Sequence, residues 1–222
     1  MIFDKTTIDI LKNFSTINTN ILIKPGSELS TLAVAKNIMA SVKVKEKFDK
    51  EFGLFNLNEF LGVLSLFDEP EIDFNDGYMM IHKGKNKVKY VYANPSILVY
   101  PTKELKMPSI NVSAELSESA LSQIQKSSSI LGVPDVALTL EDSSIVAKVY
   151  DKKNPSSNAY TVELGDASEI ANPFVANFKV ENLKVLADDY KVEVSSKNIS
   201  RFTGKKFGVV YYIAAEQDSS FE

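Results

Sequence analysis

The chain divides at Asn94-Pro95-Ser96-Ile97-Leu98-Val99-Tyr100-Pro101-Thr102-Lys103-Glu104-Leu105-Lys106-Met107-Pro108. Three prolines in this stretch each fix φ and disfavour helix in the residue before them, so we expect a stiff, extended connector. We therefore predict two domains of similar size, at residues 1–94 and 109–222, joined by an interdomain connector at residues 95–108.

On each side of the connector one pattern occurs twice, a helix followed by three short strands. An internal repeat of this kind indicates that the chain is built from copies of one structural unit. Helices are predicted over residues 4–17, 56–67, 117–131 and 180–187. Strands are predicted over residues 20–24, 29–34, 38–44, 52–55, 71–74, 78–81, 87–93, 109–114, 136–140, 145–150, 159–164, 173–178, 190–194, 199–202 and 207–214. Each domain should be a pair of βαβββ units, an α+β fold with helices on one face of antiparallel sheets.

The first predicted helix shows the amphipathic pattern clearly. Ile10, Leu11 and Phe14 share one side at 100° per residue, whereas Lys5 and Lys12 occupy the other. Asn-Asp-Gly at residues 75–77 is a strong turn signal, so we predict that a hairpin turn joins the two strands on either side of it.

The residue inventory argues against most enzymes. The chain has no Cys, a single His at position 82 and a single Arg at position 201. Zinc sites and catalytic triads usually draw on His, and phosphoryl clamps usually draw on Arg. We therefore expect no catalytic residues, no metal ion and no cofactor.

The charge and hydropathy patterns limit the partners. A formal net charge of -4 repels nucleic acid and anionic lipid at long range, so any DNA contact must be local. No uncharged apolar window of about 18 residues exists, and no basic stretch precedes an apolar signal core. We expect a soluble cytoplasmic protein without a membrane partner.

The exposed helix faces are polar and only sparsely basic. Lys5 and Lys12 share a side of the first helix, Lys126 lies on the third and Lys184 on the fourth, whereas the second helix contributes no base. Exposed lysines are common on solvated helices, so these residues alone do not establish DNA binding.

Two stretches resemble a known family: Ile10-Leu11-Lys12-Asn13-Phe14-Ser15-Thr16-Ile17-Asn18 and Leu57-Asn58-Glu59-Phe60-Leu61-Gly62-Val63-Leu64-Ser65-Leu66. They are similar to the sliding clamp of T-even-type bacteriophages, the DNA polymerase processivity factor. Weaker similarities occur at residues 136–139, 164–166 and 182–184. Length and repeat order agree from end to end, so the resemblance covers essentially the whole chain.

The resemblance implies a homotrimeric ring of six similar domains that encircles duplex DNA without regard to sequence. It implies a tether for the phage replicative DNA polymerase, loading by a clamp loader ATPase complex, a role in late transcription, and residence in the cytoplasm of the infected bacterial host. By family position the DNA-facing residues are Lys5, Lys12, Lys126 and Lys184. Family members carry a further base on the third helix where this chain has Ser129, so the positive lining should be thinner.

Closure of such a ring requires sheet edges that pair between subunits. The candidates are the strands at residues 87–93 and 159–164, whose alternating residues are Val88, Tyr90 and Tyr92 in the first and Tyr160, Val162 and Leu164 in the second. The alternative is that both are interior strands whose aromatic side chains belong to their own cores.

The resemblance also implies a groove beside the connector that receives peptide tails of partner proteins. Its apolar residues here are Leu98, Val99, Tyr100 and Pro101. Alternatively, the connector packs onto the sheet and buries these side chains, and both arrangements can hold at once. A second function class stays open as well, a β-rich structural or interaction protein of a phage virion with no DNA role.

Overall fold

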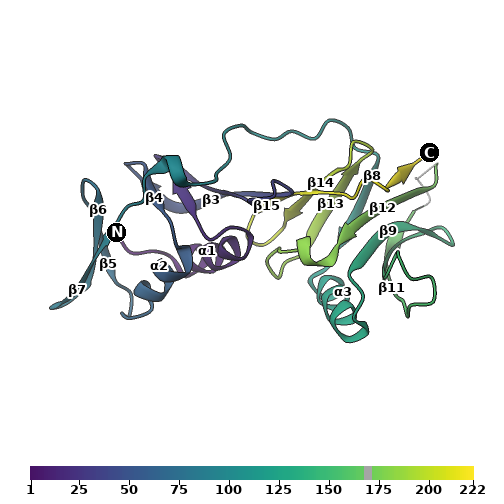
Figure 1. Cartoon of the computed structure of the whole chain (residues 1–222), viewed down its shortest axis with the longest axis horizontal. Helices are drawn as coiled ribbons and strands as arrows, with labels where there is room; N and C mark the ends of the chain where they lie inside the picture. Colours follow the sequence, from purple (N-terminus) through teal and green to yellow (C-terminus); the bar gives the residue numbers. More distant parts are fainter. Residues whose placement is uncertain (168–171) are drawn as a thin grey trace. The chain divides into compact units, whose positions relative to one another are not determined.

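A computed structural model describes residues 1–167 and 172–222 and divides the chain into two compact units, Met1–Glu104 and Leu105–Glu222 (Figure 1). We call them unit 1 and unit 2. The elements of unit 1 are α1 (Lys5–Ile17), β1 (Ile21–Ile23), β2 (Gly26–Leu32), β3 (Ile38–Phe48), β4 (Phe52–Leu54), α2 (Leu57–Leu64), β5 (Glu71–Phe74), β6 (Tyr78–Lys83), β7 (Asn86–Val91) and the 3-10 turn η1 (Pro95–Ile97).

The strands of unit 1 pair antiparallel throughout. β1 pairs with β4, β2 with β3, and β5, β6 and β7 form a three-stranded sheet in that order. The predicted turn at residues 75–77 joins β5 to β6, with Gly77 at φ 81°, a conformation that favours glycine.

An aromatic core holds unit 1 together. Phe60 on α2 packs edge-on against Phe3 and Tyr90, with ring centroids 6.1 and 5.6 Å apart, and Phe52 on β4 stacks on Tyr92 at 5.3 Å. On α1 the side chains of Ile10, Leu11 and Phe14 are buried, as their spacing predicts; the other buried residues of that helix are Thr7 and Ile17. Helix α1 packs against α2, so both helices bury their apolar sides in this core.

Unit 2, in its described residues 105–167 and 172–222, contains two antiparallel sheets and one α-helix. Its elements are β8 (Val112–Leu116), α3 (Glu118–Leu131), β9 (Asp135–Glu141), β10 (Ser144–Tyr150), β11 (Tyr160–Asp166), β12 (Phe174–Lys179), the 3-10 turn η2 (Val180–Asn182), β13 (Tyr190–Ser195), β14 (Ile199–Gly204), β15 (Val210–Ala214) and β16 (Ser220–Phe221). One sheet has the order β11-β10-β9-β12-β16, and the other includes β15-β14-β13-β8.

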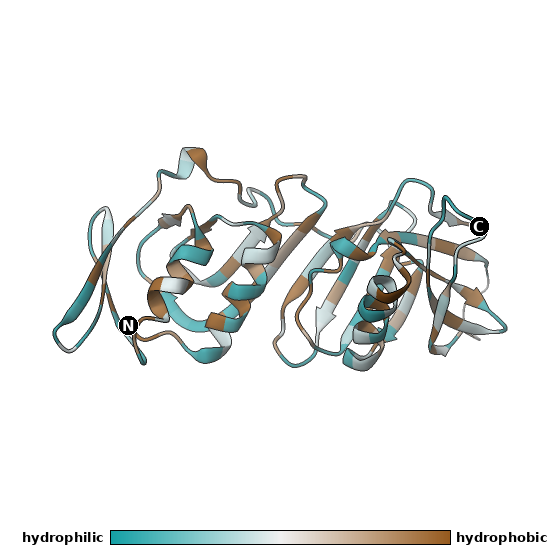
Figure 2. Cartoon of the chain, turned by 60° about the horizontal axis from the view of Figure 1, so that its bottom comes forward, coloured by the Kyte–Doolittle hydropathy of each residue, from teal (hydrophilic) through white to brown (hydrophobic). Residues whose placement is uncertain are grey.

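The core of unit 2 includes side chains from α3 and both sheets. Ile124 on α3, Val136 on β9 and Val192 on β13 line the same internal apolar space. Figure 2 shows hydrophobic and hydrophilic residues alternating along strands and helices, the pattern expected where one face of each element is buried.

The α+β class and the antiparallel sheets are confirmed, but the fourth predicted helix is wrong. Residues 180–187 contain only the single turn η2, and irregular chain follows to Tyr190. Side chains from other elements bind the backbone of this segment instead, since the Leu186 N–H donates to the Tyr211 hydroxyl and the Leu186 carbonyl accepts the Tyr190 hydroxyl. Unit 1 also lacks a strand before α1, although the Met1 nitrogen and carbonyl bond to Ile72 at 2.8 and 2.7 Å.

Candidate functional site

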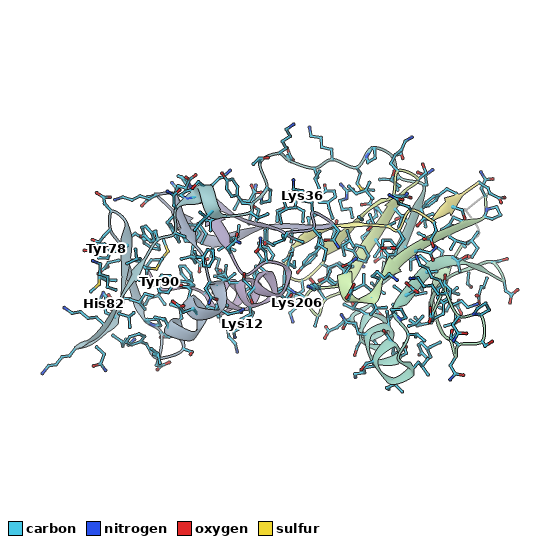
Figure 3. The ribbon with its side chains drawn as sticks, viewed as in Figure 1. Lys12, Lys36, Tyr78, His82, Tyr90 and Lys206 are labelled. Atoms are coloured by element: carbon cyan, nitrogen blue, oxygen red, sulfur yellow. The ribbon has the colours of Figure 1, made fainter. Side chains whose placement is uncertain are left out.

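The exposed face of α1 carries two of the predicted lysines. Lys5 is the first residue of α1 and Lys12 lies two turns further on, and both are exposed (Figure 3 labels Lys12). The Lys12 ammonium lies 3.2 Å from the Asp9 carboxylate, and the two side chains are 61% and 41% exposed. Such a pair is weak and leaves the lysine able to move to another anion.

The other two predicted lysines lie on neighbouring segments of unit 2. Lys126 is exposed on α3, and Lys184 is exposed in the irregular chain after η2. The Gln125 amide donates a 3.1 Å hydrogen bond to the Leu183 carbonyl, which brings these two segments together. Within each unit, therefore, two of the four lysines lie close along one surface, although Lys184 is not on a helix as predicted.

The remaining exposed helix positions are mostly uncharged. On α3 the last turn exposes Ser129 and Ile130, the latter at 82% of its full area, and α2 exposes Asn58, Glu59 and Gly62. Few cations thus face solvent on these helices, as the sequence predicted.

The connector is attached to unit 1 at its beginning. Leu98 is buried against Gly53, where an added Cβ would lie 2.5 Å from a Leu98 methyl carbon and 2.8 Å from the Ala93 carbonyl oxygen, so a larger residue would displace backbone there. Val99 donates its N–H to Asn20 at 3.0 Å and accepts a 3.1 Å bond from the Asn18 amide.

The other residues predicted for the groove are partly accessible. Val99, Tyr100 and Pro101 are half-buried, and the Lys24 ammonium lies 5.3 Å from the centre of the Tyr100 ring. Leu98 thus anchors the connector, while the three residues after it keep apolar surface available.

On β7 the predicted interface residues point into unit 1. Tyr90 packs against Phe60 and donates its hydroxyl to the Asn56 carbonyl at 3.2 Å. Burial, with Glu59 nearby, raises the pKa of Tyr90 to about 12, so this hydroxyl remains a donor at neutral pH. Tyr92 stacks on Phe52, and Val88 is half-buried.

On β11 the corresponding residues also contact their own unit. Tyr160 donates its hydroxyl to Gln123 on α3 at 3.0 Å, and Leu164 lines the apolar core beside Ile124. Val162 is half-buried on the same face. These side chains therefore contact their own unit's core, as the alternative prediction has it. β7 and β11 nevertheless each lie at the end of their sheet, so their backbones form edges.

Sequence reasoning missed one charged feature, the lysines at alternate positions 83, 85, 87 and 89 around the turn from β6 to β7. All four are exposed. The alternation of lysines is visible in the sequence, where it interleaves with the apolar residues at 88, 90 and 92. We call this feature the lysine hairpin.

Within residues 1–167 and 172–222, no helix is both long and apolar enough to span a bilayer. In the same residues, no cluster of acidic side chains with His forms a set of metal ligands.

Comparisons with known proteins agree with this fold. Residues 4–100 match the family described as DNA polymerase processivity factor, and residues 113–217 match the family described as gp45 sliding clamp, C terminal. The sliding clamp of Escherichia phage RB69 is 32% identical and covers 100% of both chains, and that of Vibrio phage KVP40 is 31% identical over 97% of this chain and 99% of the relative.

A solved structure of A. fulgidus PCNA, bound to the C-terminal region of FEN-1, superimposes with a TM-score of 0.71 at 10% identity and covers 96% of each chain. The two-unit architecture is therefore the PCNA-like sliding clamp fold. The chain belongs to the bacteriophage sliding clamp family, whose members are non-enzymatic processivity factors of DNA polymerase in DNA replication. This membership decides between the two functions left open by the sequence and sets aside the virion component.

Proposed function

We propose that this clamp closes as a homotrimeric ring around duplex DNA and tethers the phage replicative DNA polymerase. In this proposal a clamp loader ATPase complex opens the ring, and the loaded clamp also supports late transcription in the cytoplasm of the infected bacterial host. The observation that carries the proposal is that each unit pairs a lysine-bearing helix face with a sheet that ends in an edge strand, β7 in unit 1 and β11 in unit 2.

The proposed DNA contacts are Lys5, Lys12, Lys126 and Lys184. A sliding ring holds DNA topologically, so its contacts must be weak, sequence-independent and easily exchanged. Flexible, exposed lysines meet this requirement, because an ammonium binds a phosphate as a point charge without the fixed fork of arginine. The single arginine does not belong to this set, since Arg201 forms hydrogen bonds of 2.6 and 2.8 Å with Glu193.

The proposed polymerase site is the connector surface formed by Val99, Tyr100 and Pro101, with Leu98 as its buried anchor. The A. fulgidus PCNA structure holds the C-terminal region of a partner protein, which supports peptide binding as the mode of attachment. An apolar peptide side chain would gain roughly 25 cal/mol for each Å² that it removes from water there.

The DNA assignment is tested by the double charge reversal Lys12→Glu with Lys126→Glu. The matched control is Lys36→Glu with Lys153→Glu, which makes the same change in net charge at exposed turns. After loading onto circular primed DNA, the first variant should dissociate about tenfold faster or more, because phosphate attraction becomes repulsion. Its trimer mass should be unchanged. Equal retention by the two variants would show that these lysines do not face DNA.

The tethering assignment is tested by polymerase extension on a long, singly primed template. Wild-type clamp with its loader should lengthen the products of each binding event, whereas Tyr100→Ala with Val99→Ala should load normally but lengthen them less. Lys103→Ala, at an exposed position of the same connector, is the control. Normal extension by the double variant would exclude the connector as the polymerase site.

A further inference from the structure

The three-stranded sheet of β5, β6 and β7 has two different faces. Met79 and Ile81 on β6 and Tyr90 on β7 are buried in unit 1, where Phe60 of α2 packs against Tyr90. Successive residues of a strand point to opposite faces, so the residues between them lie on the side away from α2. We call this side the outer sheet face; it carries Tyr78, Met80 and His82 from β6, Lys87, Lys89 and Val91 from β7, and Glu71 and Asp73 from β5.

The middle row of the outer sheet face is aromatic and apolar. Tyr78, Met80 and His82 follow one another along β6 at intervals of about 6.7 Å, twice the rise per residue of a strand. All three are half-buried, and Val91, which is 65% exposed, lies opposite Tyr78 and widens the apolar surface (Figure 3 labels Tyr78 and His82). Planar groups can stack on such a row, because aromatic rings bind them through their faces.

The row on β7 is basic. Lys89 lies opposite Met80, Lys87 lies opposite His82, and the exposed Lys85 continues the row at the turn. Among residues 1–167 and 172–222, no carboxylate forms an ion pair with any of these lysines. The Lys89 ammonium instead lies 4.4 Å from the centre of the Tyr78 ring, a contact that is weak in solvent and leaves the cation able to bind a phosphate.

The row on β5 is acidic. Asp73 lies opposite Met80 and Glu71 lies opposite His82, and both acidic residues are exposed. The Asp73 carboxylate lies 2.9 Å from Nε2 of His82, a contact that fixes the imidazole ring on this face. Neighbouring strands are about 5 Å apart, so the face changes from basic to aromatic to acidic within roughly 10 Å.

We propose that the outer sheet face binds single-stranded nucleic acid. The phosphates lie along the lysines of β7, the bases stack on Tyr78 and His82, and amino groups of the bases reach the carboxylates of β5. Each row thus matches one part of a nucleotide. Cations bind phosphate, aromatic side chains stack on bases of any sequence, and Asp or Glu accepts a hydrogen bond from the amino group of cytosine.

The three rows favour a single strand over other anionic partners. A duplex hides the faces of its bases by pairing and stacking, so it can use only the lysines. An acidic peptide also matches the lysines alone, and Glu71 and Asp73 would repel its carboxylates. The inference goes beyond the proposed ring, because the outer sheet face points away from α2 and its use does not depend on ring closure.

The probe for this site is a fluorescein-labelled oligodeoxycytidine of about 12 nucleotides, a length within the usual footprint of a single-strand site. Its binding to the full chain is measured by fluorescence anisotropy at about 50 mM NaCl. One variant, Tyr78→Ala with His82→Ala, removes the stacking rings. A second variant, Lys87→Gln with Lys89→Gln, removes the charges.

Two controls accompany these variants. Tyr78→Phe keeps the aromatic ring and removes only its hydroxyl. Lys103→Gln with Lys106→Gln, at exposed connector positions, makes the same change in net charge as the lysine variant. Circular dichroism and sedimentation velocity verify that fold and mass are unchanged.

We expect wild type to lose about tenfold in affinity for the probe between about 50 mM and about 200 mM NaCl. Each double variant should bind about tenfold more weakly than wild type at low salt, whereas both controls should stay within about twofold. For Lys87→Gln with Lys89→Gln, the slope of log affinity against log salt should also fall by about 1.4, because two fewer phosphates are neutralised.

Two kinds of result would overturn the inference. The first is a wild type that does not bind the probe, or a variant Tyr78→Ala with His82→Ala that binds it as tightly as wild type. The second is equal affinity for a duplex of the same length or for oligoglutamate of equal charge, because neither stacks on the aromatic row.

Binding inside the proposed ring is distinguished by the variant Lys12→Glu with Lys126→Glu. This variant should bind the probe as wild type does, and the duplex and oligoglutamate are compared on it. If it loses the probe while Lys87→Gln with Lys89→Gln keeps it, the probe lies among the proposed DNA contacts, and the inference fails while the proposed function stands. A wild type that is monomeric yet binds the probe as expected would overturn the proposed ring and leave the inference in place.

Discussion

The two units differ in the segment that connects the strands of their second halves. In unit 1 the segment between β4 and β5 is the helix α2, whereas in unit 2 the segment between β12 and β13 is the single turn η2 and irregular chain. Helix α2 begins at the Asn56 cap, whose side chain accepts the Glu59 N–H, and it buries Leu57, Phe60 and Leu64. At its first residue the Leu57 N–H donates to the Thr19 carbonyl at 2.7 Å, and the stability of α2 comes from that apolar face.

The irregular segment of unit 2 obtains its hydrogen bonds from distant side chains. Leu186 donates its N–H to the Tyr211 hydroxyl at 3.2 Å, and its carbonyl accepts the Tyr190 hydroxyl at 2.7 Å. The Asp188 carboxylate accepts the N–H groups of Asp189, Lys206 and Phe207. A repeated topology can therefore be kept by burying either a helix face or a set of polar side chains, provided that every backbone group finds a partner.

Removing the buried aromatic side chain of α2 should lower the stability of the protein the most. Phe60→Ala deletes a fully buried side chain and should lower the free energy of unfolding by about 4 kcal/mol, measured by urea denaturation. Leu66→Ala, at a residue that is 70% exposed just after α2, should cost less than about 0.5 kcal/mol. A Phe60→Ala cost below about 1 kcal/mol would mean that α2 is not held by its apolar face.

Removing the carboxylate from the irregular segment should rank second. Asp188 is 2% exposed, and Asp188→Ala leaves three partly buried N–H groups without their acceptor, so we expect a loss of about 3 kcal/mol in the same measurement. Asp189→Ala is the control, because this exposed neighbour accepts one bond, from the Glu118 N–H at 2.8 Å. Equal costs for the two variants would contradict the anchoring role of Asp188.

The contrast between these segments also explains what the sequence could predict. Helical spacing found α1, α2 and α3, because each has an apolar side that its own residues define. The segment at 180–187 has a similar pattern, yet its partners Tyr190 and Tyr211 lie on β13 and β15, and no local signal reveals bonds to another element. Likewise, alternation marked one face of β7 and one of β11 correctly as apolar, but it could not say whether those faces meet a core or a second chain.

The two tyrosine hydroxyls should each contribute less than Asp188. Burial raises the pKa of Tyr190 and of Tyr211, so both hydroxyls stay protonated. Tyr190 donates to the Leu186 carbonyl, and Tyr211 accepts the Leu186 N–H. Tyr190→Phe and Tyr211→Phe keep the ring contact, with centroids 6.0 Å apart, and should each cost about 1 kcal/mol. Both hydroxyls meet Leu186, so the double variant should depart from additivity in a double-mutant cycle. Tyr78→Phe, at a half-exposed position, is the control. If Tyr190→Phe and Tyr211→Phe cost no more than this control, their hydroxyls do not stabilise the irregular segment.

The smallest expected effect is a difference in pH dependence between the N-terminal caps of α1 and α3. Asp4 caps α1, and its bonds to the Lys45 ammonium and the Thr6 N–H hold its pKa at about 2, below the usual 3.8. Because the folded pKa is the lower one, this contribution is complete above about pH 4 and is lost as pH falls toward 2. Asp4→Asn keeps an effective cap but lacks the charge, so its difference in Tm from wild type should shrink over that interval. Ser117 caps α3 through a hydroxyl that does not titrate, and the difference for Ser117→Ala should stay constant. If the difference in Tm between Asp4→Asn and wild type is also constant with pH, ionisation of Asp4 does not stabilise α1. The physical reason would be that water solvates the exposed Asp4 carboxylate as well as Lys45 does.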